Sequence, residues 1–205
     1  TKKRDCFDRV IQQINLNYST ALSRYEKTLK QRNELLKSRL NEGTIPSRDE
    51  LFAWDMMLAR YGVEIQKARA ELVKSLNEKL TEKYRSIAQN EDTVRIMYDS
   101  YTGEVDESGY LRLLALDYER DTLTGRTNFG VHKDNYEFLF NDVSADGSAS
   151  RGETRSLILA LKFVETAEIV EKLNQRPVVL LDDVFSELDS NRQKCLVENF
   201  RENQV

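Results

Sequence analysis

Two adjacent carboxylates directly follow an apolar run near the end of the sequence. Residues 178–181 are Val, Val, Leu and Leu, and Asp182 and Asp183 come immediately after them. An unbroken apolar run of this kind is typical of a strand buried on both faces of a parallel sheet, and open α/β sheets bind ligands at the carboxyl ends of such strands. The pattern favours one carboxylate that holds Mg²⁺ and a second that positions or deprotonates an attacking water. The alternative is a core strand that simply ends in an acidic turn.

Four hydrophobic residues followed by Asp form the Walker B pattern of P-loop nucleotidases. The matching phosphate loop is not found in these 205 residues. Gly125 and Gly130 have the required spacing, but Val131 and His132 follow where Lys and then Ser or Thr are needed. We therefore expect this chain by itself not to hydrolyse ATP, because none of its residues cradles the phosphates.

A second stretch suited to phosphate binding is Ser150-Arg151-Gly152-Glu153, at the predicted start of a helix. Ser150 and Glu153 have the spacing of a capping box, which is sufficient to explain both residues. The same helix N-terminus also offers backbone N–H groups, a hydroxyl and the positive end of the helix dipole to an anion, and Gly152 permits close approach. Its place some thirty residues before the paired carboxylates favours phosphate binding.

Two long helices account for most of the first 89 residues. Apolar residues recur every three, four or seven positions over 4–40 and again over 48–89. Between the two ranges Pro46 predicts a turn, and Ser47 with Glu50 predicts a capping box that opens the second helix. Two long helices joined by a short polar turn form an antiparallel hairpin.

The remainder of the chain alternates short strands and helices. The predicted elements are a strand at 94–98, a helix at 106–121, a loop at 125–130, a strand at 136–141, an amphipathic helix at 150–174, the buried strand at 178–181 and a last helix at 189–201. The predicted fold class is α/β with a long helical hairpin. We expect the helical lobe to occupy residues 1–91 and the α/β part to occupy 92–205.

Charge is divided unevenly along the chain. Residues 1–90 hold 18 Lys and Arg against 12 Asp and Glu, whereas residues 91–205 hold 13 against 23. The excess of positive charge predicts that a polyanion binds the first part, and the alternative is a solvated helix surface. The basic side chains that crowd the first helix are Arg24, Lys27, Lys30, Arg32, Lys37 and Arg39. With Tyr25 as their only aromatic neighbour, they suit contact with the phosphate backbone of duplex DNA better than base stacking.

Cysteine usage and hydropathy predict the compartment. Cys6 and Cys195 stand alone at opposite ends of the sequence, which favours two isolated thiols in a reducing compartment over a disulfide or a metal site. No apolar run approaches the length of a membrane span or a signal peptide core. We therefore expect a cytoplasmic protein. The sequence begins with Thr rather than Met, so we also expect it to be a piece of a longer protein.

Several stretches resemble one family of ATPases. SASRGETRSLILALK (148–162) and PVVLLDDVFSELD (177–189) look like the signature motif, Walker B and D-loop of ATP-binding-cassette ATPases of the SMC/RecF type. YEKTLKQRNELLK (25–37), LFAWDMMLARYGVEIQKAR (51–69) and TGRTNFGVHKDNYEF (124–138) resemble the RecF family at matching places. The resemblance covers essentially the whole chain, and it implies a middle-to-late fragment that lacks the Walker A region.

The resemblance implies a role for each residue of these motifs. The α/β part would be the signature and Walker B half of an ATP-binding-cassette (P-loop NTPase) head. Asp182 would hold Mg²⁺, and Asp183 would be the catalytic carboxylate of a slow ATPase. Ser150, Gly152 and Glu153 would lie against the γ-phosphate of ATP held by the other protomer. Ser186 and Asp189 would belong to the D-loop that crosses the dimer interface.

The resemblance also implies a function and partners. It implies a recombination mediator that dimerises with ATP and Mg²⁺ on duplex or gapped DNA, works with RecO/RecR-type mediators and helps to load RecA during the SOS response. Two alternatives stay open. One is a different SMC-like ATPase, coupled to a nuclease or acting against phage. The other is a non-catalytic helical interaction module.

The sequence departs from the family pattern in two places. Val131, Lys133 and Asn135 stand where the family commonly has Pro, Arg and Asp, and the exchange of Arg for Lys weakens any bidentate contact there. Arg151 and Glu153 stand where Gln is commoner, within the stretch that the resemblance places at the γ-phosphate. His132 is the only histidine. We favour a hydrogen-bonding role in a loop for it over a metal-binding or catalytic role.

Overall fold

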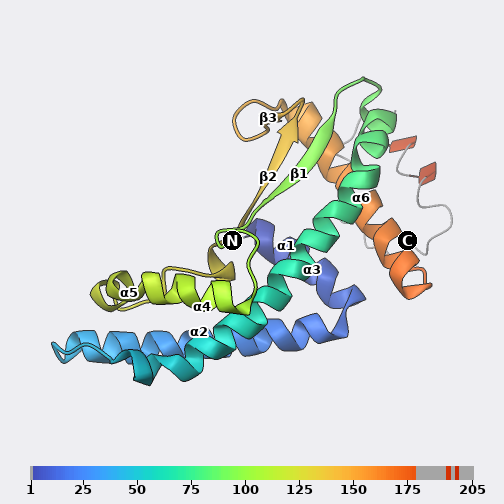
Figure 1. Ribbon diagram of the computed structural model, residues 1–205. Coiled ribbons are helices and arrows are strands. Elements are labelled where there is room, and N and C mark those ends of the chain that lie inside the picture. Colours follow the sequence, from blue (N-terminus) through green and yellow to red (C-terminus); the bar gives the residue numbers. More distant parts are fainter. Residues whose placement is uncertain (1, 179–192, 195–196, 199–205) are drawn as a thin grey trace. The chain divides into compact units, whose positions relative to one another are not determined.

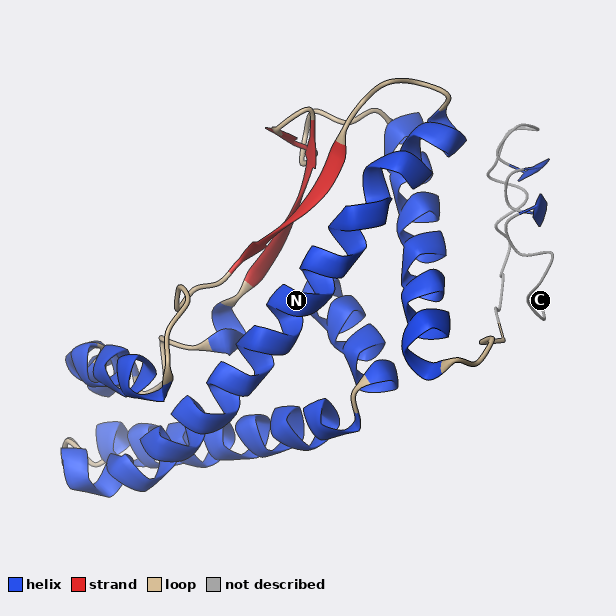
Figure 2. Ribbon diagram, turned by 45° about the vertical axis from the view of Figure 1, so that its right-hand side comes forward, coloured by secondary structure: helices blue, strands red, loops and turns tan. Residues whose placement is uncertain are grey.

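The computed structural model describes residues 2–178, 193–194 and 197–198 (Figure 1). Nearly all of the predicted buried strand, together with Asp182, Asp183, Ser186 and Asp189, lies outside the described residues. The described elements are α1 (Lys2–Ile14), α2 (Leu16–Asn41), α3 (Arg48–Ala88), β1 (Val94–Asp99), α4 (Glu107–Leu116), α5 (Tyr118–Thr124), the short 3-10 helix η1 (Val131–Lys133), β2 (Asn135–Phe140), β3 (Val143–Ser144) and α6 (Arg151–Leu173). Helices predominate, and the strands form one small sheet (Figure 2).

The chain folds as two compact units. The first unit comprises residues 1–71 and 98–135, and the second comprises 72–97 and the residues from 136 onward. The chain therefore passes between the units three times, after Glu71, Met97 and Asn135. The boundary between a helical lobe at 1–91 and an α/β part at 92–205 stays a prediction.

The first unit contains the predicted helical hairpin. The end of α2 and the start of α3 lie side by side in both ribbon views (Figures 1 and 2). The predicted seam of α3 is buried, with Leu51, Leu58 and Ile65 at most 1% exposed. The predicted capping box is also confirmed, because Glu50 N donates to Ser47 Oγ at 3.2 Å and Ser47 N donates to Glu50 Oε2 at 2.7 Å. Apolar burial and a reciprocal cap thus fix where the second helix begins.

The helix predicted over 4–40 is wrong at one position, because Asn15 separates α1 from α2. Asn15 has an extended backbone, with φ −141° and ψ 101°, and its side chain accepts a hydrogen bond from Tyr18 N at 3.2 Å. Asn is among the strongest N-cap residues, and its local hydrogen bond competes with continuation of a helix. Periodicity alone does not reveal such a break, because apolar spacing continues across it.

The helix predicted over 106–121 is likewise interrupted. Asp117 is the C-cap of α4, where its N–H donates to Leu113 O at 3.1 Å, and it is also the N-cap of α5. Asp106 caps the start of α4 by accepting from Gly109 N at 2.7 Å. Short polar side chains that bond to nearby backbone favour helix ends over helix interiors, which accounts for Asp106. The Asp117 side chain makes no capping hydrogen bond.

The small sheet lies mostly in the second unit, with strand order β1-β2-β3. The strands predicted at 94–98 and 136–141 are confirmed as β1 and β2. The two-residue β3 was not predicted. It pairs antiparallel with β2 through a two-residue turn, Asn141 and Asp142, whose φ values are 47° and 65°. Two successive positive φ values are the requirement of the tight hairpin turn that suits the twist of a sheet, and Asn and Asp tolerate them.

The second half of α3 supports both the sheet and α6 within the second unit. Asn77 bonds the backbone of Ile96 in β1 in both directions at 2.8 Å. On α6, Glu168 accepts from Ser75 Oγ at 2.5 Å, and Glu171 pairs with Lys79 at 2.6 Å. Both ribbon views show α6 alongside this part of α3 (Figures 1 and 2). The helix predicted at 150–174 is thus confirmed, and polar contacts tie its C-terminal half to α3.

Candidate functional site

The predicted signature stretch lies at the N-terminus of α6. Ser150 is the N-cap, its Oγ accepts from Glu153 N at 3.2 Å, and Ser150 N donates to Glu153 Oε2 at 2.6 Å. The capping box is therefore confirmed. Because Ser150 Oγ acts as the acceptor in the cap, its hydroxyl hydrogen is directed elsewhere and can donate to an anion. Ser150 and Arg151 are exposed, so this helix end is accessible from solvent in the described part of the chain.

Burial along α6 keeps its N-terminus in place. The apolar positions that predicted this helix are buried, with the exception of Ala167, which is exposed. Ser156, one turn after the cap, is fully buried and donates to Gly152 O at 3.1 Å. Before the cap, Ser148 N and Ala149 N both donate to Ala145 O, so the preceding segment is a closed turn. The cap is thus held from both sides, and this rigidity is what a phosphate-binding helix end requires.

The other predicted nucleotide residues lie outside the described part of the chain. These are Asp182, the predicted Mg²⁺ ligand, Asp183, the predicted catalytic carboxylate, and Ser186 and Asp189 of the predicted D-loop. Their roles stay predictions. Among the described residues there is no cluster of three or more His, Cys, Asp or Glu side chains with the spacing of a metal site.

The structure removes Arg32 from the predicted basic stripe on α2. Its side chain is 0% exposed and forms ion pairs of 2.7 Å with Asp55 and with Asp121. It also donates to Thr127 Oγ1 at 2.8 Å. A guanidinium enclosed in this way does not reach a surface polyanion. It instead ties α2 to α3 and to the segment after α5, and burial raises the pKa of the Asp55 carboxyl.

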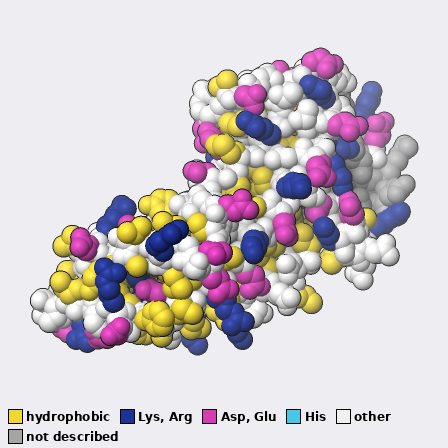
Figure 3. Space-filling model, in the orientation of Figure 1, with side chains coloured by type: hydrophobic (Ala, Val, Ile, Leu, Met, Phe, Trp, Pro, Cys, Tyr) yellow, Lys and Arg dark blue, Asp and Glu magenta, His cyan; other side chains and the backbone are white. Residues whose placement is uncertain are grey.

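The other five basic residues of the stripe lie at or near the surface. Lys27, Lys30 and Lys37 are exposed. Arg24 donates to Tyr61 Oη at 2.9 Å, and Arg39 pairs with Glu50 at 2.5 Å. Arg39 therefore offers less free charge than the sequence suggested. On the face shown in Figure 3, Lys and Arg side chains are interspersed with Asp and Glu and do not form one continuous basic patch.

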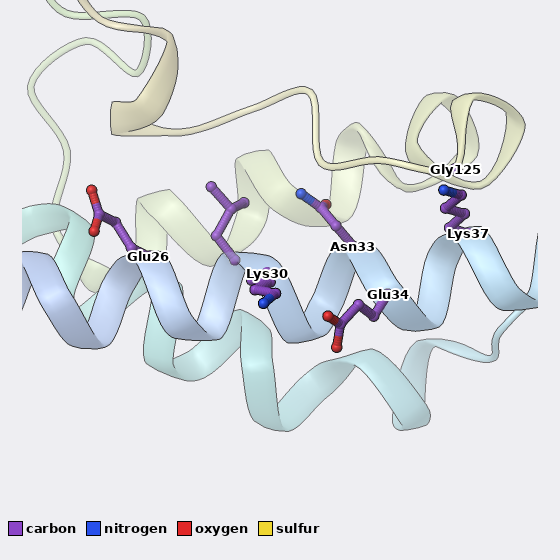
Figure 4. Close-up of a pocket in the computed structure, with 7 residues that line it drawn as sticks. Glu26, Lys30, Asn33, Glu34, Lys37 and Gly125 are labelled. Carbon is purple, nitrogen blue, oxygen red and sulfur yellow. The ribbon is translucent and has the colours of Figure 1, made fainter.

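A shallow pocket lies along the middle of α2, next to Gly125 (Figure 4). Its volume is about 410 Å³. It is lined by Glu26, Leu29, Lys30, Asn33, Glu34, Lys37 and Gly125. Figure 4 shows Asn33 and Lys37 directed toward the segment that carries Gly125, and Asn33 Oδ1 accepts from Thr127 N at 2.7 Å. Two lysines and two glutamates give this lining no net charge, so it has no preference for an anion.

The segment 125–130, which has the spacing of a phosphate loop, is a buried structural loop. Thr127, Asn128 and Phe129 are buried. Gly130 has φ 131°, and a Cβ added there would lie 2.6 Å from Tyr110 Oη. The loop is therefore closed against α2 and α4, and its backbone is not presented to a ligand. This agrees with the sequence argument that it is not a Walker A.

A relay of hydrogen bonds explains His132. Val131 N donates to Tyr110 Oη, that hydroxyl lies 3.2 Å from Tyr25 Oη, and Tyr25 Oη lies 2.9 Å from His132 Nδ1. His132 Nε2 donates to Thr127 O at 3.2 Å. This arrangement requires the neutral ring protonated on Nε2. Burial lowers the pKa of His132 to about 4, and burial raises the pKa of Tyr25 to about 12. The predicted loop hydrogen-bonding role is confirmed.

The same relay accounts for one departure from the family pattern. Val131 is 1% exposed, and its N–H is the donor to Tyr110. Proline, which the family commonly has at this place, lacks this N–H. Lys133 and Asn135, the two other departures, are exposed. The three differences thus affect one buried hydrogen bond and two surface side chains.

A buried cluster around Arg69 was missed by the sequence analysis. Arg69 is 1% exposed, Asp134 is 1% exposed, and Asp8 is 7% exposed. Arg69 pairs with Asp8 at 2.8 Å and with Asp134 at 2.9 Å, and it donates to Val131 O at 2.8 Å. Tyr18 Oη donates to Asp8 Oδ1 at 2.5 Å. The one available signal is that Asp8 lies between Phe7 and Val10 on the apolar face of α1, where a charge is unexpected without a partner.

Exposed hydrophobic side chains gather over α4, α5 and the adjoining end of the helical hairpin in Figure 3. The large exposed ones in this region are Leu40, Ile45, Phe52, Met56, Leu116 and Leu123. Tyr118 Oη donates to Pro46 O at 2.7 Å and Arg48 lies over the Tyr118 ring at 4.5 Å, so α5 closes over the turn between α2 and α3. Among the described helices, none has the length and hydropathy of a membrane span.

Comparison with known proteins identifies relatives along the whole chain, although no protein-family model matches it. The DNA replication and repair protein RecF of Streptococcus agalactiae serotype V is 36% identical over 205 residues, which cover 98% of this chain and 54% of that protein. RecF of Ruminiclostridium cellulolyticum is 34% identical over 212 residues, which cover 100% of this chain and 56% of that protein. The chain therefore spans about half the length of the curated relatives it matches.

Solved structures of RecF match equally well. A structure of the recombination mediator protein RecF-ATP in the RecFOR pathway has a TM-score of 0.89 and 30% identity, over 99% of this chain and 55% of that one. A RecF-ATPrS structure has a TM-score of 0.89 and 30% identity, over 100% of this chain and 56% of that one. The predicted fold class, a long helical hairpin with the signature-bearing part of an ATP-binding-cassette head, is confirmed by this similarity.

Proposed function

We propose that this relative of the RecF proteins is part of an ATP-dependent recombination mediator that acts in DNA repair. The similarity to RecF proteins over the whole chain supports the proposal, and so does the fold shared with RecF structures that are described with ATP. The observation that carries it is the end of α6, where Ser150 and its neighbours form a rigid, exposed helix N-terminus at the predicted signature motif.

The proposed nucleotide role follows from the chemistry of this helix end. Ser150 would donate its hydroxyl hydrogen to a γ-phosphate oxygen, and Gly152 would leave room for the phosphate to approach the first turn. The Glu153 carboxylate accepts a hydrogen bond from Ser150 N at 2.6 Å. A bound phosphate would therefore have to share this helix end with the Glu153 carboxylate. Mg²⁺, held by Asp182, would supply charge neutralisation for the phosphates, and Asp183 would orient the attacking water.

Signature and Walker B residues would serve the two nucleotides of a pair in different protomers. We therefore propose that ATP holds together a homodimer and that slow hydrolysis releases it. On DNA, the exposed cations of α2 would contact phosphates irrespective of sequence: Arg24, Lys27, Lys30, Lys37 and Arg39. Arg32 is excluded from this set by its burial. RecO/RecR-type mediators and RecA are the proposed partners, at gapped DNA in the cytoplasm.

Light scattering on the full-length protein with and without ATP tests the nucleotide proposal. ATP is expected to double the solution mass of the wild type. Asp183→Asn should retain the dimer because hydrolysis is blocked, and Ser150→Arg should abolish it because the long cation fills the γ-phosphate site. Ile158→Arg is the matched control, since it places the same side chain at a position of α6 that is 54% exposed and more than two turns from the cap.

Each outcome separates the alternatives. If ATP leaves the wild type monomeric, the shared-nucleotide arrangement is wrong, and the helical hairpin as an interaction module becomes the better account. If Ile158→Arg abolishes the dimer as fully as Ser150→Arg, the effect belongs to α6 in general and not to its N-terminus. If Asp183→Asn has no effect on ATP turnover or dimer lifetime, the paired carboxylates are vestigial.

A further inference from the structure

Arg69, its partner Asp134 and Tyr98 stand at the three places where the chain passes between the two units. The chain passes between the units after Glu71, Met97 and Asn135. Arg69 lies two residues before Glu71, after which the chain enters the second unit. Tyr98 is the first residue after the chain returns to the first unit. Asp134 directly precedes Asn135, the last residue before the chain enters the second unit again. All three belong to the first unit, and they are far apart in the sequence.

Direct hydrogen bonds join these three residues. Arg69 Nη1 donates to Asp134 Oδ2 at 2.9 Å, and Tyr98 Oη donates to the same carboxylate oxygen. Tyr101 N donates to the other oxygen, Asp134 Oδ1, at 3.0 Å. The buried Asp134 carboxylate, which directly precedes β2, thus accepts one hydrogen bond from α3. It accepts two more from Tyr98 and Tyr101, at and just after the end of β1.

A second layer of contacts holds Arg69 from the other side. Asp8 on α1 receives Arg69 Nε at 2.9 Å and Nη2 at 2.8 Å. Tyr18 at the start of α2 lies 3.2 Å from Arg69 Nε. The guanidinium is therefore fixed in both position and orientation by α1 and α2, and it presents Nη1 to Asp134.

The burial of these charges makes the cluster cooperative. A buried ion that loses its partner keeps its desolvation cost without compensation, so partial opening is much less favourable than the closed state. Removal of one of these side chains should therefore loosen all three connections between the units, and not only the connection that carries the altered residue. An equivalent set of bonds at the surface would not behave in this way, because water would replace each lost partner.

We propose that Arg69, Tyr98 and Asp134 form a coupling anchor. The anchor holds the three connections together within the first unit, so that they open and close as one cooperative element. The inference goes beyond the proposed function, because it holds whatever ligand the protein binds.

Hydrogen–deuterium exchange of the full-length protein tests the anchor. In Arg69→Met, amide protection in the segments 66–74, 96–101 and 131–137 is expected to fall together, by at least about tenfold given the loss of a buried ion pair. Arg32→Met is the matched control. It also removes a buried arginine that pairs with two carboxylates in the first unit, but it should lower protection around 119–128 and leave the three passages within about twofold of the wild type.

Two results would overturn the proposal. One is loss of protection in 66–74 alone in Arg69→Met, which would make Arg69 a local packing residue. The other is equal loss at all three passages in Arg32→Met, which would mean that any buried charge in the unit has this effect.

A milder variant covers the case in which Arg69→Met does not fold. Tyr98→Phe removes one hydroxyl, and protection should fall in 66–74, 96–101 and 131–137 while the melting temperature stays within a few degrees of the wild type. Unchanged protection in 131–137 would contradict the coupling.

Discussion

Arg69 and Asp8 are 61 residues apart in the sequence and form a two-point ion pair, with Nε to Oδ1 at 2.9 Å and Nη2 to Oδ2 at 2.8 Å. The planar guanidinium matches the two carboxylate oxygens, which fixes orientation as well as distance. The pair fastens α1 to α3 from within the core of the first unit. α1 is also held by Arg4, which donates to His132 O and to Asp134 O, and by the buried apolar face around Phe7 and Ile11.

Asp8→Ala should therefore destabilise the protein strongly. Loss of the Asp8 carboxylate removes one of the anions that compensate the buried Arg69 guanidinium, and the expected loss is about 3 kcal/mol in the free energy of unfolding. Chemical denaturation followed by far-UV circular dichroism measures it. Arg9→Ala, at an exposed position on the same helix, should cost less than about 0.5 kcal/mol. Equal losses in the two variants would show that the ion pair contributes nothing specific.

Acidification should weaken the His132 relay. The pKa of His132 lies at about 4 in the folded protein because burial disfavours the charged ring, and the ordinary value is 6.5. Since the folded pKa is lowered, the unfolded chain binds the proton first, and stability falls as the pH falls from about 6.5 to about 4. Each pH unit in this window is worth about 1.4 kcal/mol, so the total loss reaches about 3 kcal/mol.

A variant without the titrating ring isolates this effect from the carboxylates. His132→Gln keeps a polar side chain but removes the proton equilibrium. The difference in the free energy of unfolding between wild type and His132→Gln should shrink as the pH falls through this window. A difference that stays constant with pH would show that folding does not lower the pKa of His132.

Gly130→Ala should be far more damaging than Gly43→Ala. A Cβ at Gly130 would lie 2.6 Å from Tyr110 Oη, whereas a Cβ at Gly43 would meet nothing within 4 Å. Both glycines have positive φ, at 131° and 69°, so both variants pay for backbone strain, but only the first also displaces the tyrosine relay. We expect a loss of about 1 kcal/mol at Gly43 and at least about twice that at Gly130 in thermal or chemical unfolding. Similar losses would mean that the relay adjusts without cost.

Glu153→Gln should strengthen nucleotide binding in the full-length protein. The amide oxygen of Gln can still accept from Ser150 N, so the capping box is retained, while the negative charge next to the proposed phosphate site is removed. We expect ATP affinity to rise several-fold, as measured by calorimetry, with a loss of at most about 1 kcal/mol in stability from the helix dipole. Glu171→Gln, near the other end of α6, is the control and should leave affinity unchanged. An unchanged affinity in Glu153→Gln would place the nucleotide away from this helix end.

Sequence patterns predicted the helices well because each helix is specified by residues that lie close together in the sequence. The seam of α3 and the two capping boxes each depend on residues within a few positions of one another, and all were found as expected. The break at Asn15 was missed because one side-chain hydrogen bond decided it against a continuing apolar pattern.

The burial of Arg32 and Arg69 could not be predicted, because it depends on partners that are distant in the sequence. Arg32 stands among surface cations in the sequence, and its partner Asp121 lies 89 residues away. Arg69 depends on Asp8 and Asp134 in the same way, and although Ile65 and Leu72 place it on the buried face of α3, no residue near it in the sequence supplies a partner for its charge. A linear pattern reports the period of burial along a helix, but the pairing of charges across the core depends on the tertiary fold.

The length of α3 has a mechanical consequence. It is one uninterrupted helix of 41 residues that begins in the first unit and ends in the second. At about 1.5 Å per residue, the portion from Leu72 back to Arg48 is about 36 Å long, so a tilt of about 5° at Leu72 would move the start of the helix by about 3 Å. A helix of this length would act as a lever arm, so that a slight rotation near Leu72 would displace the hairpin tip by about the diameter of a water molecule.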